Sequence, residues 1–146
     1  MAGRPCLFCA IVAGDEPGHL VLSEKHVVAF LDVRPLFRGH TLLVPRRHVR
    51  TLPDLPGELV GPFFGTAQRL ERAVVAACGS EGSLVLLNNV VSQSVPHLHV
   101  HVVPRTKGDG LRFWLGPRTR YADAQDAEAM AQAVREAYDG CAPAES

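Results

Sequence analysis

The sequence has no net charge, no long apolar run and no internal repeat. Its 15 basic and 15 acidic side chains cancel, so no overall positive field attracts nucleic acid phosphates, and nucleic acid is not an expected partner. The apolar runs fall short of the roughly 20 residues that span a bilayer, and no apolar signal core follows Arg4. We therefore expect a cytoplasmic protein without a membrane partner.

The chain also lacks low-complexity tracts and long linkers. Of its 146 residues, 47% are hydrophobic and 21% are charged, a composition typical of a folded domain. A chain of this length is too short for two independent cores. We expect one α+β domain over residues 1–146, with a disordered tail from about residue 140.

Cysteines are few, and only two are close in sequence. Cys6 and Cys9 form a CxxC pair, which in a reducing compartment indicates metal binding or redox chemistry more often than a structural disulfide. A redox role fits less well, because no βαβ pattern surrounds the pair. Cys78 and Cys141 stand alone and are interpreted as ordinary side chains.

Short apolar segments and two periodic stretches predict the architecture. The helices are expected between Leu55 and Cys78, where Pro62 either starts or kinks the helix, and from Ala127 to Tyr138. The expected strands are Leu20–Leu22, Val27–Leu31, His40–Val44, Ser83–Leu87 and His97–Val103. About five strands with two main helices favour an antiparallel sheet.

The last predicted strand carries alternating histidines. Because side chains on a strand alternate between faces, His97, His99 and His101 are expected on one face and the intervening apolar residues on the other. A solvated face or a three-histidine metal site would give the same pattern. A neutral imidazole is also a nucleophile that attacks phosphorus without prior loss of a proton.

Polar side chains flank this run on both sides. Gln93 and Ser94 precede it and can donate to phosphate oxygens or to a leaving group, while Arg105 and Lys107 follow it and add positive charge. Each feature alone is ordinary loop polarity.

The whole pattern resembles the histidine triad (HIT) family. The run Gln93–Arg105, QSVPHLHVHVVPR, is similar to that family's signature, and Phe30–Pro35 and Gly39–His48 are similar to its N-terminal half. Cys6–Gly14 fits as well. These segments occur in the family's order, so the resemblance implies a HIT-like fold and an enzyme acting on nucleotides.

The resemblance assigns roles at the phosphate. It implies that His99 is the nucleophile that takes the nucleotidyl group and that His101 contacts the phosphate. Gln93 and Ser94 would bind the α-phosphate and leaving group, and His40 would support the triad.

The resemblance also implies a nucleoside pocket. Asp32 would hold the ribose hydroxyls, although Asp32–Pro35 alone is a plain turn. The base, expected to be a purine, would lie among apolar side chains, several of which are typical core residues on pattern alone: Leu7, Phe8, Ile11, Phe30 and Val33.

His101 favours hydrolysis within the family. Branches similar to galactose-1-phosphate uridylyltransferase carry Gln at this position, so the histidine favours water as the final acceptor. We expect a hydrolase of nucleoside phosphoramidates or dinucleoside polyphosphates. The alternatives are a phosphorolytic diadenosine polyphosphate nucleotidyltransferase and a zinc-stabilised nucleotide-binding adaptor without catalysis.

Some bacterial members of the family hold a structural zinc, and this chain has matching residues. Cys6, Cys9, His48 and His97 would form a tetrahedral Cys₂His₂ site. No organic cofactor is expected, and a homodimer is implied by the resemblance alone.

Two segments depart from the family pattern. The loop Asn88–Ser92 is short and lacks glycine, which leaves its backbone contacts to phosphate and any role of Asn88 or Asn89 unassigned. The segment Leu111–Tyr121, with Trp114, is not assignable from the general family pattern and is a candidate for substrate preference.

Overall fold

The computed structural model describes residues 5–112 and 119–141. It divides into two compact units, one reaching Asp109 and the other beginning at Gly110, and each is described by itself. Trp114 and the tail after Cys141 lie outside the described residues, so the single domain over 1–146 and its disordered tail stay predictions. No described helix combines the length and apolarity that crossing a bilayer requires.

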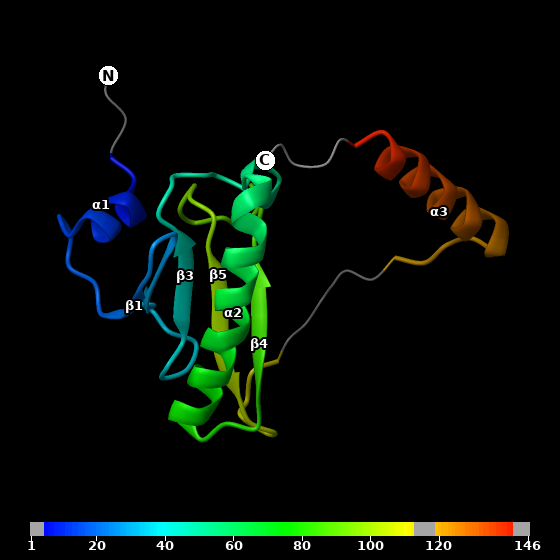
Figure 1. Cartoon of the computed structure of the whole chain (residues 1–146). Helices are drawn as coiled ribbons and strands as arrows, with labels where there is room; N and C mark the ends of the chain where they lie inside the picture. The colour runs from blue at the N-terminus through cyan, green and yellow to red at the C-terminus, as the bar shows by residue number, and fades with distance from the viewer. Residues whose placement is uncertain (1–4, 113–118, 142–146) are drawn as a thin grey trace. The chain divides into compact units, whose positions relative to one another are not determined.

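The first unit is built on a five-stranded antiparallel sheet (Figure 1). Its strands are β1 (Leu20–Ser23), β2 (Val27–Leu31), β3 (Thr41–Pro45), β4 (Gly82–Leu87) and β5 (Val100–Arg105). They lie in the order β1-β2-β3-β5-β4, so β5 is inserted between β3 and β4. The predicted α+β class and antiparallel sheet are confirmed.

Two helices of very different length accompany this sheet. The short α1 spans Leu7–Ala13, and α2 spans Gly57–Cys78 with Pro62 inside it. Both end at a glycine with left-handed φ, +84° at Gly14 and +59° at Gly79, where a side chain would be disfavoured. A 3₁₀ turn, η1 (Leu52–Asp54), precedes α2. The predicted long helix is confirmed, and α1 is an addition to the two that were expected.

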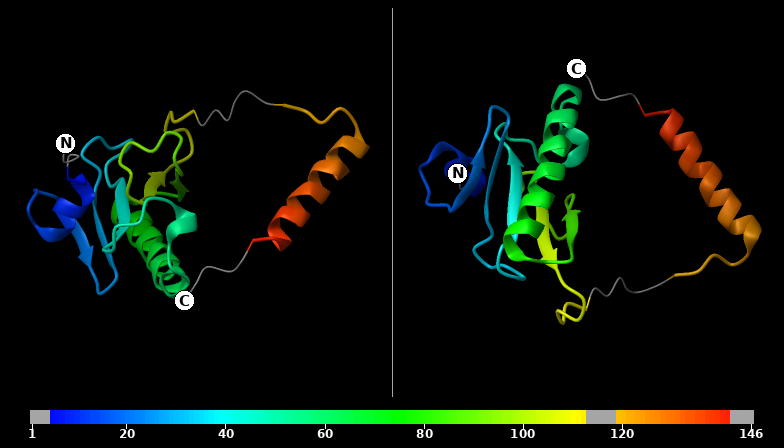
Figure 2. Two further views of the ribbon diagram at one scale, coloured as in Figure 1. Left: turned by 90° about the horizontal axis from the view of Figure 1, so that it is seen from above. Right: turned by 60° about the horizontal axis from the view of Figure 1, so that its bottom comes forward.

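The two faces of the sheet form separate apolar clusters. On one face α2 packs Phe63 and Leu70 against Ala29, Leu43 and Val100. Burying a side chain of this size contributes roughly 1.5–3 kcal/mol. On the other face, Phe8 of α1 packs with alternate strand residues: Val28, Phe30, Leu42 and Val44. The helices therefore cover opposite faces (Figure 2).

The strand predicted over His97–Val103 is wrong at its start, because β5 begins at Val100 and only the last triad histidine lies on it. Pro45, the last residue of the neighbouring strand β3, has no backbone N–H to donate to a strand partner. Its carbonyl lies 2.9 Å from Nε2 of His97 instead. The alternation of faces nevertheless extends upstream of the strand, since Leu98 and Val100 are both buried in the cluster against α2.

The loop between β4 and β5 contains two non-glycine residues with left-handed φ, +65° at Val90 and +60° at Ser92. A β-branched residue in this region is strained. Asn89 ties the loop down, because its Oδ1 accepts the Leu52 N–H at 2.8 Å. Asn89 therefore has a structural partner at the start of η1.

The second unit contains α3, Ala124–Asp139, which confirms the final predicted helix. Asp123 caps it by accepting the N–H of Asp126 at 2.9 Å. None of the residues of α3 is buried among the described parts of the chain.

Candidate active site and metal centre

His99 lies at the floor of a pocket and is only 2% exposed. Its Nδ1 is 2.7 Å from the carbonyl oxygen of His97. Because a carbonyl oxygen only accepts, Nδ1 carries a hydrogen, and the tautomer that this bond selects has its lone pair on Nε2. The ring of Phe8 stands edge-on to it, with centroids 5.1 Å apart. This tautomer leaves Nε2 available as a nucleophile.

A second hydrogen-bond chain fixes His101. Nδ1 of His40 accepts the N–H of Leu36 at 3.1 Å, so Nε2 of His40 carries a hydrogen. That Nε2 lies 2.9 Å from Nδ1 of His101 and 3.6 Å from a carboxylate oxygen of Asp32. His101 therefore accepts at Nδ1 and keeps its hydrogen on Nε2.

Burial favours the neutral forms of the His40 and His101 imidazoles. It lowers the pKa of His101 to about 4, with further lowering by the charges of His99 and His40 and an opposing rise from Asp32. Burial also lowers the pKa of His40, again against the carboxylate. At neutral pH, the His101 imidazole is a hydrogen-bond donor without positive charge.

The pocket above these histidines has a volume of about 460 Å³. Most of the side chains implied for the nucleoside and phosphate line it: Leu7, Phe8, Phe30, Asp32, Val33, Ser94, His99 and His101. Ile11 packs behind Phe8, and His40 lies beneath His101. Sequence reasoning missed Leu42, although alternation along β3 places it on the same face as Phe8.

Asp32 stands at the rim of this pocket, directly after β2. One of its oxygens accepts the N–H of Arg34 at 2.8 Å, the local bond of an Asx turn. The carboxylate is thereby held in place. Arg34 also lines the pocket and was missed by sequence reasoning, which treated it as part of a plain turn.

Ser94 and Gln93 are neighbours with different surroundings. Ser94 lines the pocket. The amide of Gln93 donates to the carbonyl of Arg50 at 2.6 Å and accepts the Val90 N–H at 3.3 Å. Gln93 does not line the pocket among the described residues, and both ends of its amide hold the loop.

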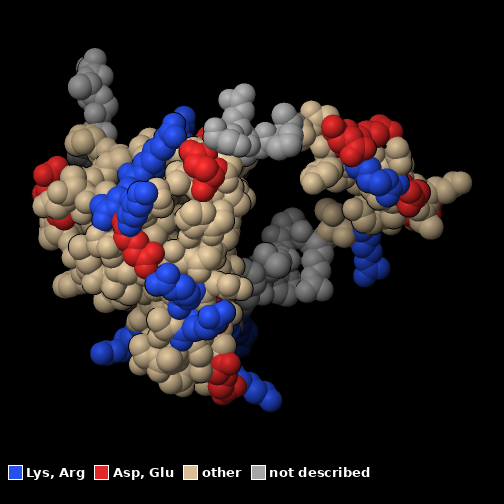
Figure 3. Space-filling view, in the orientation of Figure 1, with Lys and Arg blue, Asp and Glu red and all other residues tan. Residues whose placement is uncertain are grey.

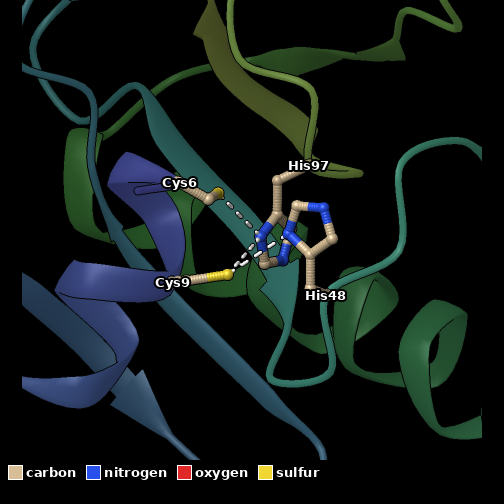
Figure 4. Close-up of side chains that lie close together, drawn as sticks. All are labelled: Cys6, Cys9, His48 and His97. Atoms are coloured by element: carbon tan, nitrogen blue, oxygen red, sulfur yellow. Dashed lines mark hydrogen bonds between the residues drawn. The ribbon is translucent and has the colours of Figure 1, made fainter. Parts of the chain in front are cut away.

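The CxxC pair meets two histidines that are distant in sequence (Figure 4). Sγ of Cys9 lies 3.2 Å from Nδ1 of His48 and 3.5 Å from Nδ1 of His97, and Sγ of Cys6 lies 3.4 Å from the latter. All four possible ligand atoms fall within 4.8 Å of one another. The set implied for zinc is thus brought together.

The donors fit a metal ion. The Pro45 carbonyl accepts from Nε2 of His97, so Nδ1 of that ring turns its lone pair toward the two sulfurs. The pKa of the Cys9 thiol is raised to about 11, by burial and then by the hydrogen bond and charge of Cys6. A cation supplies the positive charge that favours thiolates. Two thiols and two imidazoles are a zinc-type donor set.

The three triad histidines do not form the alternative metal site. His97 groups with the cysteines, whereas His101 groups with Asp32 and His40 in the described part of the chain. Figure 3 shows acidic and basic side chains interspersed rather than gathered by sign on the visible face. The site thus combines an apolar pocket, a carboxylate and a buried imidazole.

Comparisons with known proteins agree on one family. The HIT domain model matches residues 13–108. The chain is 37% identical over 135 residues to a HIT-like protein of Mycobacterium tuberculosis, covering 91% of this chain and 92% of that protein.

Two relatives have names that state an activity. The adenosine 5'-monophosphoramidase HNT1 of Saccharomyces cerevisiae is 33% identical over 102 residues, 68% of this chain and 62% of that protein. The adenylylsulfatase HINT3 of Arabidopsis thaliana is 32% identical over 108 residues, 73% of this chain and 55% of that protein.

Solved structures are similar over nearly the whole chain. A HIT family protein of Bacillus subtilis gives a TM-score of 0.83 at 32% identity, covering 91% of this chain and 96% of that one. A zinc-bound histidine triad family protein of Mycobacterium smegmatis gives 0.69 at 36% identity, covering 90% and 96%. On sequence, fold and triad together, the chain belongs to the HIT domain family.

Proposed function

We propose that the protein is a nucleotide hydrolase that cleaves at the α-phosphate through a covalent nucleotidyl-His99 intermediate. Its substrates are nucleoside phosphoramidates or dinucleoside polyphosphates. The observation that carries the proposal is the bond from Nδ1–H of His99 to the His97 carbonyl, which leaves the Nε2 lone pair beside the pocket. The name of the yeast relative, a monophosphoramidase for an adenosine nucleotide, supports both a phosphoramidate and a purine.

In the proposed reaction the base lies against the apolar pocket wall that includes Phe8 and Phe30, and Asp32 accepts from the ribose hydroxyls. Nε2 of His99 attacks the α-phosphorus, a P–N bond forms, and the bond to the leaving group breaks. The Nε2–H of His101 donates to the phosphate or leaving group. Water then attacks the same phosphorus and the P–N bond to His99 breaks, which releases the nucleoside monophosphate and restores the imidazole. The leaving group takes up one proton from solvent in the first step, and the attacking water gives up one in the second.

Ser94 would donate its hydroxyl to a phosphate oxygen. Gln93, whose amide is held by Arg50 and Val90, would act by positioning that serine. Reaching the phosphate itself would require Gln93 to give up these bonds. We therefore assign Gln93 to the loop and Ser94 to the substrate.

A substrate panel tests the proposal. Wild type should release AMP from an AMP-amine substrate, and His99→Asn should lower kcat by at least about 1,000-fold because no nucleophile remains. Circular dichroism should show an unchanged fold. Wild-type turnover by the variant would refute the covalent mechanism.

Two further outcomes identify the alternatives. Cleavage of diadenosine tetraphosphate that produces ADP only when inorganic phosphate is added would identify the phosphorolytic transferase. Nucleotide binding without a trapped nucleotidyl-protein and without turnover would identify an adaptor.

We also propose that Cys6, Cys9, His48 and His97 hold a structural zinc ion. The donor set and the tautomer of His97 support this, as does the zinc named in the M. smegmatis homologue. Such an ion would contribute folding free energy by joining α1 to the segments before α2 and β5.

A homodimer is the proposed assembly. β4 is an edge strand, and Phe64 of α2 and Val85 of β4 are exposed apolar residues that line one groove. A second copy that covers this groove would remove both the strand edge and the apolar surface from water. Sedimentation of a species with twice the chain mass would support it, and a monomer at all concentrations would refute it.

A further inference from the structure

His97 belongs to two sites at once. Its imidazole Nδ1 faces the sulfurs of Cys6 and Cys9, while its backbone carbonyl accepts from Nδ1 of His99. Its Nε2 is held by the Pro45 carbonyl. A residue fixed at the cysteine cluster therefore also presents the acceptor that sets the tautomer of the nucleophile.

Helix α1 also links the cysteine cluster to the pocket. Cys6 and Cys9 flank Leu7 and Phe8, both of which line the nucleotide pocket. The Phe8 ring stands edge-on to the imidazole of His97, with ring centroids 6.0 Å apart. The two pocket residues thus lie between the two cluster residues within one helical turn.

This helix has few other anchors. It spans only Leu7–Ala13, its N-terminus has no side-chain cap, and Phe8 is its one buried residue. A helix of this length does not persist in water by itself. Ile11 and Val12 are only partly buried against the same cluster as Phe8. The position of α1 over the pocket therefore depends on these apolar contacts and on the two cysteines that contact His48 and His97.

We propose that the Cys6/Cys9/His48/His97 cluster is a metal-dependent clamp on the nucleotide pocket. When the cluster holds a metal ion, α1 lies over the base and the His97 carbonyl keeps its hydrogen bond from Nδ1 of His99. Without the metal, α1 with Leu7 and Phe8 detaches, and nucleotide is bound weakly. The proposal rests on the proposed nucleotide site and adds that a cation outside it governs its affinity.

The test compares the zinc-loaded full chain, the chelated chain and His48→Ala. His48 is exposed, so its replacement removes a ligand without opening the core. AMP, the product of the proposed reaction on an adenosine substrate, is titrated by calorimetry, because its binding can be measured without turnover. Hydrogen exchange reports the α1 amides with no nucleotide present. Cys78→Ser, a cysteine outside the cluster, is the matched control.

We expect chelation and His48→Ala to weaken AMP binding at least tenfold, in the range that loss of a supporting partner produces. Both should also accelerate hydrogen exchange of the α1 amides while the α2 amides stay protected. Cys78→Ser should match wild type, and zinc should restore the chelated chain. Equal AMP affinity and equal α1 exchange with and without zinc would overturn the clamp.

The outcomes separate this proposal from the proposed function. A zinc-loaded chain with protected α1 that binds no AMP refutes the nucleotide site and, with it, the clamp. If chelation unfolds the whole chain, Phe8→Ala decides. It should keep zinc and lose AMP affinity at least tenfold, and wild-type affinity in this variant would refute the role of α1.

Discussion

Nε2 of His40 lies 2.9 Å from Nδ1 of His101, and the two rings are tilted by 46°. Since His40 is buried and its other nitrogen accepts the Leu36 N–H, this contact has one direction, from His40 to His101. The pair thereby decides which nitrogen of His101 carries its hydrogen toward the pocket.

Removing the donor should affect kcat more than KM. We expect His40→Leu to lower kcat by about ten- to a hundredfold, because His101 then samples the tautomer that cannot donate from Nε2. KM should change little, since His40 does not line the main pocket. His40→Gln, which keeps an N–H donor, is the matched control and should retain more of the rate. A rise in KM alone in His40→Leu would contradict the positioning role.

The lowered pKa of His101 predicts acid sensitivity of the fold. Its pKa is about 4 in the folded chain and 6.5 when unperturbed. Between these values the unfolded chain binds the proton and the folded chain does not, so the free energy of unfolding falls as pH drops from about 6.5. Urea denaturation at pH 7.5, 6 and 5 measures this.

His101→Gln provides the control for that measurement. It should show a shallower decline than wild type, because one of the lowered imidazoles is gone while any loss of metal at low pH affects both proteins. Identical slopes for the two proteins would contradict the prediction.

Val90 offers a stabilising substitution. It is 73% exposed and has a φ of +65°, so Val90→Gly relieves strain without opening a cavity. Strain relief of about 1–3 kcal/mol exceeds the entropic cost of glycine, about 0.5–1 kcal/mol, so we expect a net gain of up to about 2 kcal/mol. Val91→Gly, at an equally exposed neighbour for which no left-handed φ is found, should not stabilise. Denaturation midpoints that fall in both variants would disprove the strain.

The cysteine cluster predicts a metal stoichiometry. Elemental analysis of the purified chain should give about one zinc per chain, and Cys6→Ser should lose the metal with a large drop in Tm. Cys141→Ser, which alters an exposed cysteine in the other unit, should keep both. A zinc-free wild type of full stability would refute the assignment.

Local patterns were sufficient for much of the fold. The alternation from His97 to His101 identified the polar face, because neighbouring side chains on an extended backbone point to opposite sides whether or not the ladder continues. The periodicity between Leu55 and Cys78 likewise predicted the helix whose Phe63 and Leu70 face the core. Both depend only on near neighbours.

Features with distant partners were not predictable. Gln93 was assigned to the phosphate, but its amide contacts Arg50, which only the folded chain brings near. The start of β5 depends on Pro45 ending its partner strand. The left-handed Val90 has no local signal, because the usual glycine is missing there. For Gln93 and for the start of β5, the deciding partner lies elsewhere in the chain.

The strand order has a consequence for synthesis on the ribosome. β5 is the last strand to be made, yet it pairs with both β3 and β4 in the interior of the sheet. Until residue 105 has left the exit tunnel, β3 is paired only with β2 and β4 has no partner strand, so both expose an edge open to intermolecular pairing. The same segment delivers His101 to His40, so the growing chain completes its sheet and its proposed active site in one step.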